Sequence, residues 1–227
     1  MLLLAIDTSG KQGSIALARA CEQTAEGDFE VIEIAPLVGG TFSAQLIPQV
    51  SELLSSNGFM KTAIGAFAVV SGPGSFTGLR IGLAAVKALA EVLHKPIAAV
   101  SLLEVCVFAS GARGKIMAIL DAGRTDVYVG EYEIPGAAGS LSRERILSRN
   151  EFLSQAAGLK VVTPDSALAG VAAAAGLSVS TLPAISAADA ARLGWRKIQS
   201  GHTVAPEQLE ANYIRRSDAE MLEKIGS

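Results

Sequence analysis

Short apolar runs that end in polar turns alternate with stretches of helical periodicity along the chain. Residues 2–6 are apolar and lead into an Asp-Thr-Ser-Gly turn, after which residues 14–18 resume the apolar pattern. Apolar runs of this length between turn residues are typical of strands. The pattern therefore predicts a hairpin with Asp7 at its tip, and the β-forming residues of 29–34 predict a third strand.

The next segment changes to the period of a helix. Phe42, Leu46 and Val50 recur at intervals of about four residues, which predicts an amphipathic helix over residues 41–55. The first half then continues with a strand over 66–70, a glycine-rich loop over 71–78, a helix that ends near residue 93 and a strand over 97–100.

The second half repeats this order. It predicts strands over 116–120, 127–132, 145–147, 161–163 and 179–182, and helices after Asn150 and over 165–175 and 186–200. Asp121 ends the first of these strands as Asp7 ends the first strand of the chain. A duplicated βββαβα unit with an acidic turn in each copy is the plan of the actin-like ATPase (ASKHA) fold. We therefore expect an α/β protein with two lobes of mixed sheet flanked by helices.

The expected lobes are residues 1–105, which hold the dimerisation helices, and residues 106–227, whose C-terminal tail is a candidate to pack back on the first lobe. No low-complexity linker separates them. The 227 residues are 50% hydrophobic and 18% charged, which excludes intrinsic disorder. No apolar run is long enough to cross a membrane and the first residues lack a basic leader, so we expect a cytoplasmic protein.

Charge and cysteine usage exclude further classes. The net charge of −3 argues against a dedicated nucleic-acid-binding protein, which usually carries a basic face. Cys21 and Cys106 are far apart, so neither a disulfide framework nor a zinc site is expected, and the apolar surroundings of Cys106 predict a buried, inert thiol. His94 and His202 are expected at the surface, and no metal site is predicted.

The two acidic turns have two interpretations. In the actin-like plan such turns face each other across a cleft and hold phosphates and a metal, which makes a nucleotide cleft a candidate site. Its candidate residues are Asp7, Thr8, Ser9, Asp121 and Gly123. Turn acids also bind their own backbone, so a purely structural role stays equally open.

The glycine-rich loop and the helix after it can each be interpreted in two ways. The loop lacks a Gly-Lys-Ser/Thr ending, so it is not a P-loop, and a rigid turn capped by Ser75 or Thr77 is favoured. The helix carries charge only at Arg80, Lys87 and Glu91. A helix that is apolar nearly all round must be covered on nearly all sides, either by its own chain or by another.

Several motifs together resemble the TsaB (YeaZ) family. They are Ala5-Ile6-Asp7-Thr8-Ser9, the run from Gly72 to Gly82, Leu120-Asp121-Ala122-x-Arg124 and Tyr213-Ile214-Arg215. The sequence departs from that family at Phe42, where many members have His, and at Ala211-Asn212-Tyr213, which replaces Pro-x-Tyr.

The resemblance implies a non-catalytic subunit that dimerises with, and stabilises, the complex forming N6-threonylcarbamoyladenosine (t6A) next to the anticodon of tRNAs that read codons starting with A. Its implied partners are a TsaD-like catalytic paralogue and a TsaE-like ATPase, with a homodimer when the chain is alone. tRNA would be contacted mainly through the partners, with help from Arg215 and Arg216. No cofactor of its own is expected, although weak ATP or ADP binding stays open.

The resemblance also places the partner interface on the two helices of the first half. The expected interface residues are Phe42, Leu46, Val50, Leu53, Phe76, Leu79 and Leu83. Aligned with the catalytic paralogue, Leu102 and Cys106 stand where that protein has its metal-binding His-x-x-x-His pair, so the metal site is missing.

The alternative function is an active small-molecule kinase or ATPase of the same superfamily. Such enzymes carry Asp-x-Gly at the first phosphate turn, where this chain has Ser9. Asp121-Ala122-Gly123 fits that pattern better in the second copy.

Overall fold

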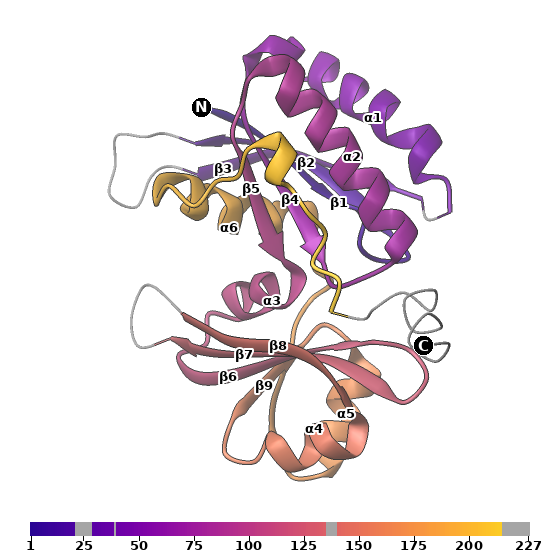
Figure 1. The fold of residues 1–227 in the computed structure, drawn as a ribbon, viewed down its shortest axis with the longest axis vertical. Helices are drawn as coiled ribbons and strands as arrows, with labels where there is room; N and C mark the ends of the chain where they lie inside the picture. Colours follow the sequence, from indigo (N-terminus) through magenta and orange to yellow (C-terminus); the bar gives the residue numbers. More distant parts are fainter. Residues whose placement is uncertain (21–28, 39, 135–139, 215–227) are drawn as a thin grey trace, which may run out of the picture.

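Two five-stranded mixed sheets organise the molecule, one in each of two lobes (Figure 1). The computed structural model describes residues 1–20, 29–38, 40–134 and 140–214. The first sheet has the order β3-β2-β1-β4-β5 and consists of β1 (Leu2–Asp7), β2 (Gly13–Ala20), β3 (Phe29–Leu37), β4 (Ile64–Gly72) and β5 (Ile97–Ser101). The second has the order β10-β9-β6-β7-β8 and consists of β6 (Gly114–Asp121), β7 (Asp126–Ile134), β8 (Ser140–Ser148), β9 (Lys160–Thr163) and β10 (Ser178–Thr181).

The two sheets share one topology. In each, the first strand of the lobe pairs antiparallel with the second and parallel with the fourth, as β1 does with β2 and β4, and β6 with β7 and β9. Helices follow the third, fourth and fifth strands of each lobe. They are α1 (Phe42–Ser56), α2 (Phe76–Leu93) and α3 (Leu102–Ser110), then α4 (Arg149–Gln155), α5 (Ser166–Ala174) and α6 (Ala187–Gln199). The predicted duplication and fold class are confirmed.

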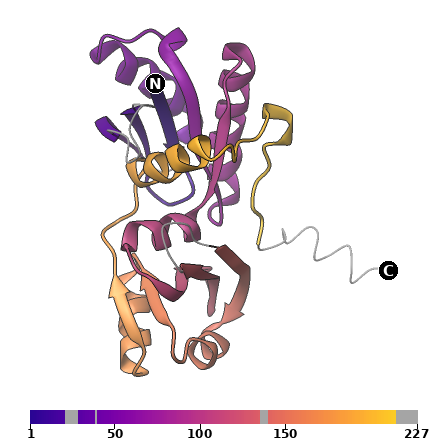
Figure 2. The same cartoon turned by 90° about the vertical axis from the view of Figure 1, so that its left-hand side faces the viewer.

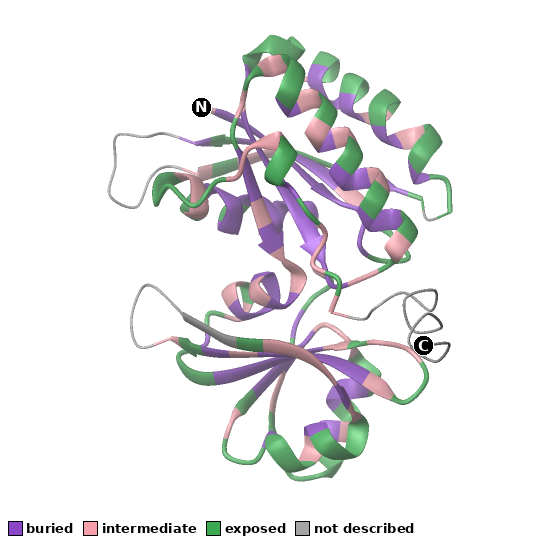
Figure 3. Cartoon of the chain, viewed as in Figure 1, coloured by how far each residue is buried: buried purple, intermediate pink, exposed green. Residues whose placement is uncertain are grey.

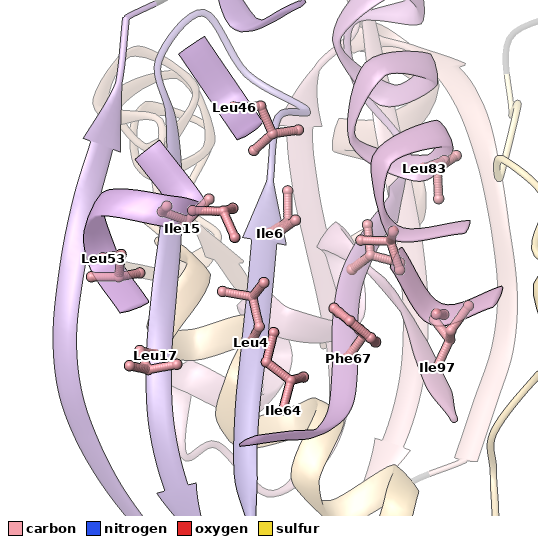
Figure 4. Packing of buried hydrophobic residues seen from close by; sticks show 14 of the residues in the cluster. Leu4, Ile6, Ile15, Leu17, Leu46, Leu53, Ile64, Phe67, Leu83 and Ile97 are labelled. Atoms are coloured by element: carbon pink, nitrogen blue, oxygen red, sulfur yellow. The ribbon is translucent and has the colours of Figure 1, made fainter. Parts of the chain in front are cut away.

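The hydrophobic core of the first lobe has one layer on each face of its sheet. Leu4, Ile6 and Ile15 point toward α1 and α2, where they meet Leu46 and Leu83 (Figure 4). Strand residues alternate between the two faces, so Leu3 and Ala5 point the opposite way. There they pack against α6 and its Trp195.

The last helix of each lobe packs on the other lobe. The α3 residues Leu103 and Cys106 belong to the core of the second sheet. The α6 residues Ala188 and Ala191 belong to the core of the first. The two helices also meet each other, through a cluster that contains Val105 of α3 and the α6 residues Ala190 and Leu193. Figure 2 shows α6 against the first sheet.

The lobes are therefore not consecutive halves of the chain. The expected boundary at residue 105 falls inside α3, and α6 lies on the first lobe. The segment after α6 continues along the first lobe: Val204 bridges Ile97, Leu209 is buried in its core, and the Asn212 N–H donates to the Ser71 carbonyl at 2.7 Å. That segment includes the short 3-10 helix η2 (Pro206–Gln208), and another, η1 (Lys61–Ala63), precedes β4.

One carboxylate joins the lobes and the C-terminal segment. Glu144 of β8 accepts hydrogen bonds from the Ser101 hydroxyl, from the Tyr132 hydroxyl at 2.7 Å and from the Asn212 side chain at 2.5 Å. Ser101 belongs to β5 and Tyr132 to β7.

A second link between the lobes is the ion pair of Lys197 in α6 with Glu104 in α3, at 2.6 Å. These contacts fix the lobes relative to each other.

Among the strands and α-helices, α3 is the one that the pattern does not predict. Its nine residues are almost uniformly apolar, so they carry no helical period. The other predicted strands and helices are present, with ends that differ by a few residues. In the part of the chain that the structure describes, no helix is long and apolar enough to cross a membrane.

Small side chains allow α6 to lie close to the sheet, and this contact gives a test. A Cβ added at Gly194 would lie 2.5 Å from the Cβ of Ala68, whereas one added at Gly170 in α5 would meet nothing. We expect Gly194→Ala to lower the free energy of unfolding by about 1–3 kcal/mol through overpacking. Gly170→Ala is the matched control and should raise it by about 0.5–1 kcal/mol through helix propensity. Urea unfolding of both variants measures the difference, and equal effects would contradict this packing.

Candidate functional site

A cleft of about 820 Å³ lies between the lobes. From the first lobe it is lined by the turn after β1 and by the start of α2, and from the second by the end of β6 and the start of α5. Its polar lining residues are Ser9, Lys11, Ser43, Ser75, Thr77, Asp121, Tyr128 and Asp165. The topology thus brings the two acidic turns to one cleft, as the repeat predicts.

Asp7 does not line this cleft. The side chain is buried, and its Oδ1 accepts hydrogen bonds from the Ser9 N–H at 2.9 Å and the Ser9 hydroxyl at 2.6 Å. Burial raises the pKa of the Asp7 carboxyl, and the two Ser9 hydrogen bonds oppose that rise. Asp7 therefore closes its own turn, which is the structural role that the sequence left open.

Thr8 is also withdrawn from the cleft, beneath α2. Its hydroxyl donates to the Gly78 carbonyl at 2.7 Å. A Cβ at Gly78 would collide with the Thr8 carbonyl oxygen, and one at Gly82 with the Thr8 hydroxyl. The glycines of this helix therefore let it approach the β1 turn closely.

The glycine-rich loop packs on the same turn. The Ser75 N–H donates to the Ser9 carbonyl at 2.7 Å, and a Cβ at Gly74 would collide with that same carbonyl oxygen. Ser75 caps α2, because its hydroxyl accepts the Gly78 N–H at 3.3 Å. The predicted capped, rigid turn is confirmed for Ser75.

In the second lobe, Asp121 is exposed and faces the cleft, with its Oδ1 accepting the Gly123 N–H at 3.2 Å. Gly123 does not line the cleft. Of the five candidate nucleotide residues, Ser9 and Asp121 thus reach the cleft, whereas Asp7, Thr8 and Gly123 do not.

Two charged lining residues were not predicted. Lys11 lies in the first turn, with no motif around it to mark a function. Asp165 caps α5 by accepting the N–H groups of Ala167 at 2.8 Å and Leu168 at 3.0 Å. The cleft therefore offers the Lys11 amine and several hydroxyls, which can donate to a phosphate group, beside the Asp121 and Asp165 carboxylates, which would repel one. No cluster of three or more His, Cys, Asp or Glu fit for a metal ion occurs in the described ranges.

Six of the seven expected interface residues lie in the hydrophobic core. Phe42, Leu46, Val50, Leu53, Leu79 and Leu83 are at most 7% exposed, and only Phe76 is partly exposed. Figure 4 shows Leu46, Leu53 and Leu83 among the residues of the sheet. Helical periodicity identifies the apolar face, and here the chain's own sheet covers that face. These six side chains cannot contact a partner while the lobe is folded.

Phe76 has a different neighbour. Its ring stacks on that of Tyr213 with the centroids 4.6 Å apart, and the Arg80 Nε–H donates to the Tyr213 hydroxyl at 3.0 Å. The C-terminal segment thus packs on the start of α2.

The prediction for Cys106 is confirmed. Its thiol is buried, and burial raises its pKa to about 12, so no reactive thiolate forms near neutral pH. His94 and His202 are exposed, as predicted. Cys21, Arg215 and Arg216 lie outside the described residues.

The raised pKa of Asp7 gives a prediction about pH. A carboxyl whose pKa is higher in the folded chain than the ordinary 3.8 contributes a stabilisation that is fully present below pH 3.8. This contribution is lost as the pH rises from there to the folded-state pKa. Asp7→Asn keeps an oxygen that accepts both Ser9 hydrogen bonds, so it should raise the free energy of unfolding at neutral pH and flatten this loss. The exposed Asp121→Asn is the control and should change it by less than about 0.5 kcal/mol. Denaturant unfolding across pH measures both, and a destabilised Asp7→Asn at neutral pH would contradict the pKa direction.

Comparisons with known proteins agree with this architecture. The family model for TsaD, tRNA N6-adenosine threonylcarbamoyltransferase, matches residues 36–188. The tRNA threonylcarbamoyladenosine biosynthesis protein TsaB of Bacillus subtilis is 38% identical over 135 residues, which are 59% of this chain and 56% of the relative. TsaB of Escherichia coli is 35% identical over 138 residues, 59% of this chain and 55% of the relative. The chain thus spans about half the length of the curated relatives it matches.

Solved structures extend the similarity along the chain. YeaZ from Pseudomonas aeruginosa has a TM-score of 0.72 and 26% identity, covering 93% of this chain and 99% of that one. A second P. aeruginosa structure, of a protein with similarity to peptidase YEAZ, has a TM-score of 0.73 and 27% identity, covering 94% and 99%. The family model covers more than half of the sequence. The chain therefore belongs to the family of TsaD, tRNA N6-adenosine threonylcarbamoyltransferase, and its relatives there are TsaB (YeaZ) proteins.

Proposed function

We propose that the chain is a dimerisation and stabilising subunit of a threonylcarbamoyl transferase complex that forms t6A in tRNA. Its partners would be a TsaD-type catalytic paralogue and a TsaE-type ATPase, and a second copy of the chain would replace the paralogue when it is alone. The relatives' names as t6A biosynthesis proteins support this pathway. The net charge of −3 supports contact with tRNA mainly through the partners.

The observation that carries the proposal is the outer surface of α1 and α2. Both helices cover the same face of the first sheet, and their outer sides face solvent (Figure 3). Most exposed residues of the two helices are small or apolar, and they include Ala44, Ile47, Pro48, Ser51, Thr77, Ala84, Ala88 and Val92. The charged residues Glu52, Arg80 and Glu91 are exposed as well. Ile47 is 51% and Val92 is 71% exposed. This set replaces the buried leucines as the proposed interface.

Such a surface suits a pair of helices from a partner. Small side chains let helix axes approach closely, and Ile47 and Val92 would supply apolar area to bury. Two helices from each protein would form a four-helix bundle. An ordinary stable interface buries about 800 Å² of each partner, which a contact between two helix pairs can supply. A structurally related paralogue, with the same helices in the same places, would match this surface in shape.

The cleft supports a non-catalytic role. The Asp7 carboxylate is held inside its own turn and does not line the cleft. Of the two lining carboxylates, Asp165 accepts hydrogen bonds from the start of α5, which leaves Asp121 as the one that does not cap a helix. We therefore propose no cofactor of the chain's own and, at most, weak binding of ATP or ADP in the cleft. The second candidate function, a small-molecule kinase or ATPase, is favoured by the cleft's 820 Å³ and by Lys11 in its wall.

The interface is tested by a charge placed on its exposed surface. Ala84→Glu should weaken association with a TsaD-type protein by about ten-fold or more, because the carboxylate loses its water on binding. The melting temperature of the Ala84→Glu variant should equal that of the wild type, because Ala84 is exposed in the single chain. Ala173→Glu makes the same change at an exposed position of α5 and should associate like the wild type. Analytical ultracentrifugation of the mixtures measures this, and unaltered association of Ala84→Glu would reject the interface.

The function is tested by mass-spectrometric measurement of t6A in a reaction with TsaD-type and TsaE-type proteins. We expect t6A to require this chain and to form equally well with Asp121→Ala, because the cleft is not the reacting site. ATP hydrolysis by the chain alone, lost in Asp121→Ala, would instead favour the kinase or ATPase. If t6A forms fully without the chain, the proposed function is wrong.

A further inference from the structure

A second pocket, of about 880 Å³, lies on the molecule apart from the cleft. Its walls come from α3, from α6 with the turn after it, and from the end of β7. The two pockets share no lining residue. The size is within the range of sites for small organic ligands, about 300–1,000 Å³. Figure 1 shows α3 where the two lobes meet, with α6 on the first lobe.

The inner wall of the pocket is apolar and partly aromatic. Val107 and Leu193 are buried, and the ring of Phe108 is partly exposed. Tyr132 contributes its ring while its hydroxyl donates to Glu144. A planar, apolar group would therefore find contacts here that need no hydrogen bond from the wall.

The charged residues of the pocket are mainly cationic. Arg113, Arg196 and Lys197 line it, against a single acidic residue, Glu104. Lys197 is paired with Glu104 at 2.6 Å, so these two charges offset each other. The salt bridges in the described part of the chain leave Arg196 without a carboxylate. Arg196 thus adds to the pocket a positive charge that no salt bridge among the described residues offsets, in a protein whose net charge is −3.

Arg196 is also oriented for binding. Its guanidinium carbon lies 4.8 Å from the centre of the Phe108 ring, which holds the group over an aromatic face. A guanidinium carries five N–H donors, so those that do not face the ring can donate to an oxyanion. An anionic group and an adjacent flat ring would therefore be bound by the same pair of side chains.

We infer that this pocket binds a small aromatic anion, with its anionic group on Arg196 and its ring against Phe108 and the apolar wall. The site is independent of the t6A proposal, since it uses neither the outer surface of α1 and α2 nor the cleft. Because α3 and α6 each belong to the core of the opposite lobe, a ligand here contacts the junction of the two lobes.

Fluorescence titration of the full-length chain with 8-anilino-1-naphthalenesulfonate, an aromatic sulfonate, tests the inference. We expect saturable binding that Arg196→Gln weakens about ten-fold or more, because a charge-assisted hydrogen bond is lost. Arg192→Gln is the matched control: it lies one turn earlier on α6, is exposed and lines neither pocket. It should bind like the wild type. Circular dichroism of both variants checks that α6 is folded.

Two further arms can overturn the inference. N-phenyl-1-naphthylamine has the same rings without the sulfonate, so its binding should be weaker and insensitive to Arg196→Gln. Lys11→Gln, in the wall of the cleft, should leave sulfonate binding unchanged. Absence of saturable binding, equal losses in Arg196→Gln and Arg192→Gln, or a loss confined to Lys11→Gln would each reject this pocket as the site.

Discussion

The close contact of α6 with the first sheet is the interaction on which the rest of the structure depends. It is possible because both surfaces are built from small residues: Gly194 lies on Ala68, and alanines of α6 face alanines of the sheet. Since α6 follows the second sheet in the chain, this contact connects the two lobes, and α6 also packs against α3 where they meet. The ion pair of Lys197 and Glu104 and the hydrogen bonds of Glu144 strengthen the same junction.

The β1 turn explains why the first of the two acidic turns does not present its carboxylate to the cleft. Gly78 and Gly82 let α2 lie directly on Thr8, and Ser9 holds the Asp7 carboxylate inside its own turn. The segment that would present an acid to a phosphate is instead part of the wall that carries α2. The result is a rigid first lobe whose outer helices, rather than its cleft, are the surface proposed for partners.

The sequence predicts most of the fold, because nearly all strands and α-helices except α3 are marked either by an apolar run or period or by the turn and capping residues at their ends. Leu102–Ser110 lacks a period, because it is buried between the lobes on several sides. The site is less predictable. Periodicity locates Leu46 and Leu79 on an apolar face but does not say whether the sheet or a partner covers it. Likewise, Asp7 and Asp121 occupy equivalent turns, and only the packing of α2 separates the buried acid from the exposed one.

The placement of α6 has a consequence for biosynthesis. While the ribosome makes the second lobe, the first sheet has α1 and α2 on one face, but its other face, with Leu3 and Ala5, has no cover until residues 187–199 emerge. The first lobe is thus completed last, although its strands are made first. Contacts between residues so distant in the chain form slowly, and an uncovered apolar face is prone to aggregate. The face of the first sheet that carries Leu3 and Ala5 therefore stays an exposed apolar surface of the nascent chain until α6 has been made.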